Sequence, residues 1–137
     1  MSDAVLENMI LGVDIGGTKC AVISGKVNYS RNNIVNNIKI IDKVIFPTDS
    51  RKGPEHAIKK IIEKIDLMID KQNKQKSENL QFKAIGVSCG GPLDSKRGII
   101  LSPPNLYKWD NIKIVEILEK QFKIKTRLQN DANACAL

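Results

Sequence analysis

The sequence predicts an α/β fold, a five-stranded mixed sheet with flanking helices in the order β-β-β-α-β-α-β. Short apolar runs bounded by Gly, Pro or Asn recur along the chain, which is typical of buried strands. Between them, two segments carry apolar residues at offsets of three and four, which is typical of amphipathic helices. With 137 residues, 42% of them hydrophobic and 27% charged, the chain has the size and composition of one globular domain.

The first two strands are expected to form an antiparallel hairpin. Residues 9–14 are an apolar run that ends in an acidic residue, and residues 20–25 are a second run that follows at once. Between the two runs lie Gly16 and Gly17. Because a turn with two glycines permits the backbone conformations of a tight hairpin, this is the simplest connection.

The third strand and the first helix follow a polar stretch. Residues 28–37 are rich in asparagine and are expected to be a loop or a long hairpin tip. The third strand is expected over residues 38–46, and Pro47 closes it. The apolar period then changes to that of a helix over residues 54–71, with Pro54 in the first turn, where proline is favoured.

The second half of the chain alternates strands and helices. A fourth strand is expected over residues 82–88, and a proline-rich loop with a short edge strand over residues 97–106. A short amphipathic helix is expected over residues 114–122 and a last strand over residues 125–129. Residues 132–137 have the pattern of a further helix. We expect helices to pack against both faces of the sheet.

Charge and hydropathy narrow the classes of partner. The formal charge of +7 would permit a polyanionic partner. The basic residues are dispersed, however, and only 4% of the residues are aromatic, so we do not expect a nucleic-acid partner. The apolar run over residues 9–13 is far too short to span a bilayer, and we expect no membrane partner and a cytoplasmic location.

The three cysteines have the spacing of neither a disulfide framework nor a CxxC metal site. Cys20, Cys89 and Cys135 each lie among apolar or small residues. We therefore expect three reduced thiols and no zinc site in this chain.

The first candidate site is the segment between the first two strands. Gly16 and Gly17 can present successive backbone N–H groups to phosphate oxygens, while Thr18 adds a hydroxyl and Lys19 a positive charge. Asp14 can hold the hydrated magnesium that accompanies a nucleotide. The segment is not a Walker A loop, because it lacks that spacing and joins two strands. A plain hairpin turn would explain the two glycines but not the flanking charges.

Two further candidate segments follow later strands, and ligands of α/β sheets gather at strand ends. Gly90 and Gly91 follow the fourth strand, and Asn130 and Asp131 follow the last. A carboxylate beside an amide could bind two neighbouring sugar hydroxyls and accept the proton of the one that attacks phosphorus. From local sequence alone, a helix N-cap is the preferred interpretation of Asp131.

In order and spacing, these segments together resemble the ROK family of repressors, open reading frames and kinases. The motifs are Asp14-Ile15-Gly16-Gly17-Thr18-Lys19, Gly90-Gly91-Pro92, Pro104-Asn105-Leu106 with Trp109, and Asn130-Asp131-Ala132-Asn133. The resemblance implies an actin-like ATPase (ribonuclease H-like) lobe. It implies that residues 1–137 are the N-terminal lobe, and that the C-terminal lobe, with the family's structural zinc, is absent from this chain.

The resemblance also implies an ATP-dependent hexose kinase of the glucokinase type, with ATP and Mg²⁺ as cofactors and a homo-oligomeric complete protein. Asp131 would be the general base, and the residues implied to bind sugar are Gly90, Gly91, Asn105, Asn130 and Asp131. Those implied to bind the ATP phosphates are Asp14, Gly16, Gly17, Thr18 and Lys19, with Asp14 holding magnesium through water. Only residues 1–8 precede the first strand, which favours the kinase branch over DNA-binding repressors.

Two alternatives stay open at this stage. A non-catalytic sugar-sensing or transcription-regulatory ROK protein would keep the sugar-binding residues but would not need Asp14, Thr18 and Lys19. Another actin-like ATPase would not need the later glycine and asparagine motifs. We expect no kinase activity from the isolated chain, because half of the cleft would be missing.

Overall fold

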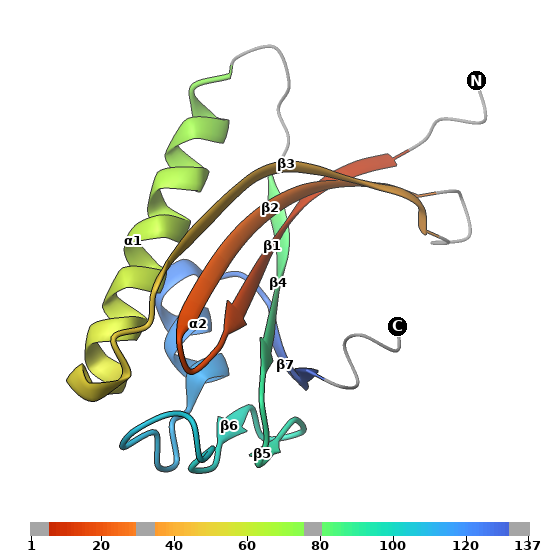
Figure 1. Cartoon of the computed structure of the whole chain (residues 1–137). Coiled ribbons are helices and arrows are strands. Elements are labelled where there is room, and N and C mark those ends of the chain that lie inside the picture. Colours follow the sequence, from red (N-terminus) through yellow and green to blue (C-terminus); the bar gives the residue numbers. More distant parts are fainter. Residues whose placement is uncertain (1–5, 30–34, 76–80, 132–137) are drawn as a thin grey trace.

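The computed structural model describes residues 6–29, 35–75 and 81–131, and its elements follow the predicted order (Figure 1). The strands are β1 (Leu6–Ile15), β2 (Lys19–Tyr29), β3 (Val35–Pro47), β4 (Phe82–Cys89), β5 (Leu93–Asp94), β6 (Ile99–Ile100) and β7 (Thr126–Asn130). The helices are α1 (Pro54–Asn73), α2 (Ile114–Phe122) and a short 3₁₀ turn, η1 (Ser50–Lys52). The helix expected over residues 132–137 and Cys135 lie outside the described residues.

The main sheet has five strands in the order β3-β2-β1-β4-β7, which confirms the predicted five-stranded mixed sheet. β2 pairs antiparallel with both β1 and β3, whereas β4 runs parallel to β1 and β7 parallel to β4. The parallel strands β1, β4 and β7 therefore all point their carboxyl ends toward one edge of the sheet. The two-residue strands β5 and β6 form a separate small hairpin beyond that edge.

Strands β1, β2 and β3 extend further than the sequence predicts. The stretch expected as a loop over residues 28–37 contributes its ends to the sheet, since β2 runs to Tyr29 and β3 starts at Val35. The antiparallel pairing of β2 with β3 continues to these ends, with a shift of register between Ser24 and Gly25. These strand ends carry polar side chains, so a search for apolar runs does not find them. A strand at the edge of a sheet can carry polar residues because both of its faces can be solvated.

Both helices cover the same face of the sheet, so the expectation that helices cover both faces is wrong for the described residues. Alternate residues of the central strands, such as Leu11, Val13 and Val87, are buried on this face. Against them pack Ile61 of α1 and Leu118 of α2. The core forms in this single layer between sheet and helices, where burying each large apolar side chain contributes roughly 1.5–3 kcal/mol.

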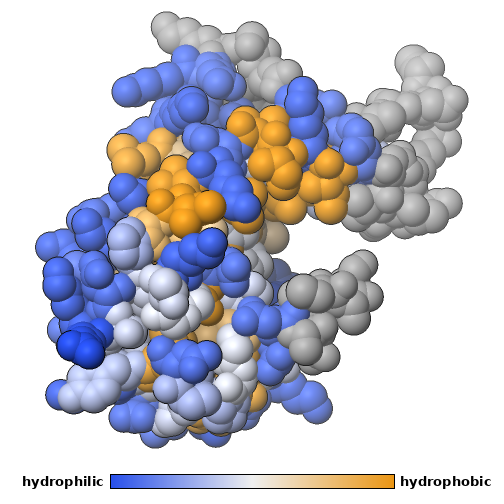
Figure 2. Space-filling model, in the orientation of Figure 1, coloured by the Kyte–Doolittle hydropathy of each residue, from blue (hydrophilic) through white to orange (hydrophobic). Residues whose placement is uncertain are grey.

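The opposite face carries no helix within the described residues. Its central row pairs Gly12 directly with Gly86, and this part of the face holds a groove of about 460 Å³. Apolar surface continues along β3, where Ile38, Ile40 and Ile45 are more than half exposed, and Figure 2 shows apolar side chains gathered over this strand. Sheets with parallel strands are usually covered on both faces, whereas here the described helices cover one.

Two of the expected free thiols lie inside the fold. Cys20 and Cys89 are both buried and unpaired by disulfide. Burial, helped by the charge of Asp131, raises the pKa of Cys89 to about 12, so this thiol stays protonated. As for the membrane, neither helix of the described part of the chain carries an apolar stretch that could cross a bilayer.

Candidate functional site

The three predicted segments meet at one edge of the sheet. Ile15, the last residue of β1, pairs with Cys89, and Cys89 pairs with Asn130. The residues that follow these three strand ends therefore leave the sheet next to one another. Segments separated by more than 110 positions in the sequence thus share one end of the fold, which is where α/β sheets bind their ligands.

A small pocket of about 90 Å³ lies at this edge and gathers most of the expected sugar-binding residues. Its lining consists of Ile15, Gly16, Gly17, Gly90, Gly91, Pro103, Pro104, Asn105, Leu106 and Asp131. The groove on the open sheet face is larger, but its lining is mainly apolar. Because converging polar groups define a binding site better than volume does, we take the small pocket as the candidate functional site.

The segments that line the pocket come very close to one another at Gly17 and Gly91. A methyl group at Gly17 would lie 2.7 Å from Cβ of Asn105 and 2.9 Å from its carbonyl oxygen. One at Gly91 would lie 2.7 Å from Nδ2 of Asn130. Glycines at these two positions let the backbone come within contact distance of the two asparagine residues.

A buried anchor holds the loop that carries Asn105. Trp109 is fully buried in the core, and its carbonyl oxygen accepts a hydrogen bond of 2.9 Å from the Ser102 amide. A turn in which the Leu106 amide donates to the Pro103 carbonyl at 3.0 Å presents Asn105 at the surface. Trp109 thus supports the pocket wall from below, without lining the pocket.

The first segment forms the predicted hairpin turn. The Gly16 amide donates to the Lys19 carbonyl at 3.1 Å, while Thr18 and Lys19 are exposed. Within the described residues, no backbone hydrogen bond uses the amides of Gly17 and Thr18. These two donors are therefore unused, whereas the Gly16 amide, which the sequence also predicts to face phosphate oxygens, is engaged within the turn.

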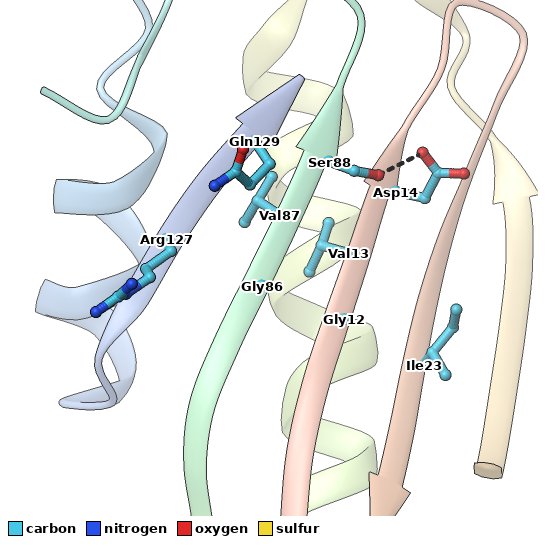
Figure 3. Close-up of a pocket in the computed structure, with 9 residues that line it drawn as sticks. All are labelled: Gly12, Val13, Asp14, Ile23, Gly86, Val87, Ser88, Arg127 and Gln129. Atoms are coloured by element: carbon cyan, nitrogen blue, oxygen red, sulfur yellow. Dashed lines mark hydrogen bonds between the residues drawn. The ribbon is translucent and has the colours of Figure 1, made fainter. Parts of the chain in front are cut away.

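Two carboxylates lie close together beside the pocket. Asp14 is exposed, and its Oδ1 accepts a hydrogen bond of 3.0 Å from the Ser88 hydroxyl (Figure 3). Burial raises the pKa of Asp131, and the negative charge of Asp14 raises it further, whereas a hydrogen bond from Ser88 lowers it. The Ser88 hydroxyl therefore lies within reach of both acids, and its effect on Asp131 is to favour the ionised carboxylate.

We expect Ser88→Ala to raise the pKa of Asp131 above its value in the parent chain, because the substitution removes the hydrogen bond that lowers this pKa. The measurement is a ¹³C NMR titration of the aspartate carboxyl groups. Ser95→Ala, at an exposed serine in the turn between β5 and β6, is the matched control. An unchanged Asp131 titration in Ser88→Ala would show that Ser88 does not act on this carboxylate.

The structure does not bring every predicted residue into the small pocket. Asp14 lines the groove on the open face, at its end nearest the pocket, and Thr18 and Lys19 lie at the turn outside. Among the described residues, no group of three or more His, Cys, Asp or Glu side chains could hold a metal ion. A single exposed carboxylate such as Asp14 suits magnesium, which keeps most of its water and usually binds one or two protein carboxylates plus phosphates.

Two residues of this region, Ser88 and Thr48, have no individual role predicted from the sequence. Ser88 lies 74 positions from Asp14, and the hydroxyl of Thr48 donates to the Gly16 carbonyl from 32 positions away. The alternation of β4 could have placed Ser88 on the same face as Asp14, since the parallel register pairs the two residues. Thr48 follows the end of β3, and its local sequence gives no sign of the contact.

Comparison with known proteins agrees with this geometry. The chain is 26% identical over 133 residues to a glucokinase of Halalkalibacterium halodurans, and the match covers 96% of this chain and 36% of that protein. It is also 26% identical over 129 residues to a xylose repressor of Caldicellulosiruptor bescii, with coverage of 93% and 29%. The chain thus spans about a third of the length of these curated relatives.

Solved structures give the same result. A crystal structure of a ROK hexokinase from Thermus thermophilus superposes with a TM-score of 0.65 at 29% identity, over 93% of this chain and 37% of that one. The ROK family model matches residues 10–137, which is nearly the entire chain. The fold is therefore that of the ROK proteins, and this chain belongs to the ROK family.

Proposed function

We propose that this chain is the N-terminal, ATP- and sugar-binding lobe of a kinase that transfers the γ-phosphoryl group of ATP to a hexose hydroxyl. The observation that carries the proposal is the convergence of Asp131, Asn105 and the glycine loops in one small pocket. The unused amides of the turn after β1 lie next to it. A sugar site and a phosphate site would then adjoin, as in-line phosphoryl transfer requires.

In this proposal Asp131 is the general base. Its carboxylate accepts the proton of the hexose hydroxyl as the oxygen of that hydroxyl bonds to the γ-phosphorus and the bond from phosphorus to the ADP oxygen breaks. The raised pKa of Asp131 makes its carboxylate a better proton acceptor than an ordinary aspartate. The side chains of Asn130 and Asn105 would hold neighbouring hydroxyls and so fix which oxygen attacks.

The turn at Gly17 and Thr18 would bind the ATP phosphates through its backbone N–H groups, with Lys19 adding positive charge. Magnesium, which enters with the nucleotide, would supply charge neutralisation. The exposed carboxylate of Asp14 is the group that would hold its water shell. We expect the isolated chain to be inactive, because the second half of the cleft would come from a C-terminal lobe.

The test is a coupled ADP-release assay with magnesium ATP and a panel of hexoses. It is run on this chain and on the same chain extended through the reading frame that follows Leu137. Hexose-dependent ADP release by the extended protein supports the proposal, and the preferred hexose names the substrate, for which we propose glucose. Sugar binding without ADP release would overturn it.

A second candidate function is sugar sensing without catalysis. The observation that favours it is the match to the xylose repressor, which is as high in identity as the match to the glucokinase. A sensor has no need of the free amides at Gly17 and Thr18. Sugar binding measured by calorimetry in a protein that releases no ADP would support the sensor.

A further inference from the structure

Thr48 makes two hydrogen bonds to the turn that would bind the ATP phosphates. Its hydroxyl donates to the carbonyl oxygen of Gly16 at 2.6 Å, and its amide donates to the carbonyl oxygen of Thr18 at 2.9 Å. The residue is fully buried directly after β3. One residue after a separate strand thus holds both ends of the turn, through its side chain at Gly16 and through its backbone amide at Thr18.

The hydroxyl of Thr48 has a second hydrogen-bond partner, the thiol of Cys20. Sγ of Cys20 lies 3.3 Å from Oγ1 of Thr48. A threonine hydroxyl carries a single hydrogen, and here that hydrogen is directed to Gly16, so the thiol must be the donor to Oγ1. Burial raises the pKa of Cys20, which keeps the proton that this bond needs. The chain of donors therefore runs from Cys20 through Thr48 to Gly16.

This bond determines the direction of a donor on the ligand side of the turn. In a trans peptide group, the carbonyl and the following N–H point in opposite directions. Because the Gly16 carbonyl points inward to Thr48, the Gly17 N–H must point away from the core. Within the described residues, no backbone hydrogen bond uses that N–H.

We propose that Thr48 is a positioning residue for nucleotide binding, because its hydroxyl orients the Gly16–Gly17 peptide so that the Gly17 N–H meets a phosphate oxygen. The proposal rests on the proposed function, since it takes the ligand of this turn to be the triphosphate of ATP. Thr48 itself would not touch the nucleotide. Its removal should weaken the binding of ATP and leave the hexose site unchanged.

The experiment compares Thr48→Val with Thr48→Ser and Thr126→Val. Valine keeps the shape of threonine but removes the hydroxyl, whereas serine keeps the hydroxyl. Thr126 is the matched control, because it is also buried and its hydroxyl also donates to a backbone carbonyl, that of Ile124, at 3.0 Å. It lies at the start of β7, at the other end of the sheet from the pocket.

In the extended protein, we expect Thr48→Val to raise the KM for magnesium ATP about tenfold, with the KM for hexose unchanged, as for a lost hydrogen bond to a charged ligand. Thr48→Ser should restore the KM for ATP to within about twofold of the parent. Thr126→Val should lower the melting temperature but leave both KM values unchanged. Equal KM values for ATP in Thr48→Val and Thr126→Val would overturn the proposal.

A second readout does not depend on activity. The ¹⁵N NMR order parameter of the Gly17 amide in this chain should fall from the rigid range, about 0.85, toward about 0.6 in Thr48→Val, and stay unchanged in Thr126→Val. A Gly17 amide that is already flexible in the parent, or that stays rigid in Thr48→Val, would overturn the positioning role. If no protein releases ADP but this readout behaves as expected, the kinase proposal fails while the role of Thr48 in the turn stands.

Discussion

Asp131→Asn in the extended protein is expected to lower kcat by about 10²–10⁴-fold, the usual contribution of a general base. Asparagine has the shape of aspartate and can still donate and accept hydrogen bonds at the rim of the pocket. It cannot accept the proton of the attacking hydroxyl. The KM for hexose should therefore change much less than kcat.

The same substitution should make the fold more stable at neutral pH. Burial and the charge of Asp14 raise the pKa of Asp131 in the folded chain above its unfolded value of about 3.9. A carboxyl group with a raised pKa costs stability when it ionises, and this cost is absent below the unfolded pKa. The melting temperature of Asp131→Asn should exceed that of the parent near pH 7 and equal it in acid.

Asp66→Asn is the matched control, because Asp66 is exposed on α1 and outside the pocket. It should change neither kcat nor the melting temperature. Two measurements are needed, a steady-state assay and a thermal melt followed by circular dichroism at several pH values. Near-normal turnover in Asp131→Asn would remove Asp131 from the role of base, and a lower melting temperature at neutral pH would contradict the electrostatic argument.

Gly17→Ala is expected to lower kcat/KM about 100-fold, the loss typical of a misplacement of about 1 Å in a catalytic site. The added methyl group would lie 2.7 Å from Cβ and 2.9 Å from the carbonyl oxygen of Asn105. Neither atom can move without the backbone of the Asn105 loop. The substitution therefore separates the proposed phosphate turn from the proposed sugar loop, and such overpacking costs roughly 1–3 kcal/mol of stability.

Two other glycines provide controls for this effect. A methyl group at Gly86 meets no atom within 4 Å, so Gly86→Ala should leave the melting temperature of this chain unchanged. At Gly91 the methyl group would closely meet only the end of a side chain, Nδ2 of Asn130 at 2.7 Å, and the nearest backbone atom would be 3.8 Å away. Gly91→Ala should therefore destabilise less than Gly17→Ala. Equal melting temperatures for Gly17→Ala and Gly86→Ala would contradict the close approach.

The sequence predicted most of the fold because local patterns determine most of it. Residues close together in the sequence predict α1 and α2 through apolar offsets of three and four. They also predict the turn after β1 through its glycines. The pairing of Ile15 with Cys89 and of Cys89 with Asn130 is not local, yet it follows once the strands are parallel. The three candidate segments could therefore be placed at one edge before the structure was known.

The remaining features depend on contacts that a single sequence does not display. Thr48 and Ser88 are ordinary residues in their local context, and their hydrogen-bond partners lie 32 and 74 positions away. The placement of both helices on one face also escaped prediction. Gly12 and Gly86 break the apolar pattern of their strands, but alternation alone does not tell which face a helix will cover.

The open face of the sheet ties packing to electrostatics. Asp14 lies at the end of the groove that Gly12 and Gly86 create, so any layer packed on this face would take water away from its carboxylate. The charge of Asp14 already raises the pKa of Asp131. With less water around Asp14, the local dielectric would fall and this charge would raise the pKa of Asp131 more strongly. A layer packed on the open face would in this way change the pKa of Asp131 without touching Asp131.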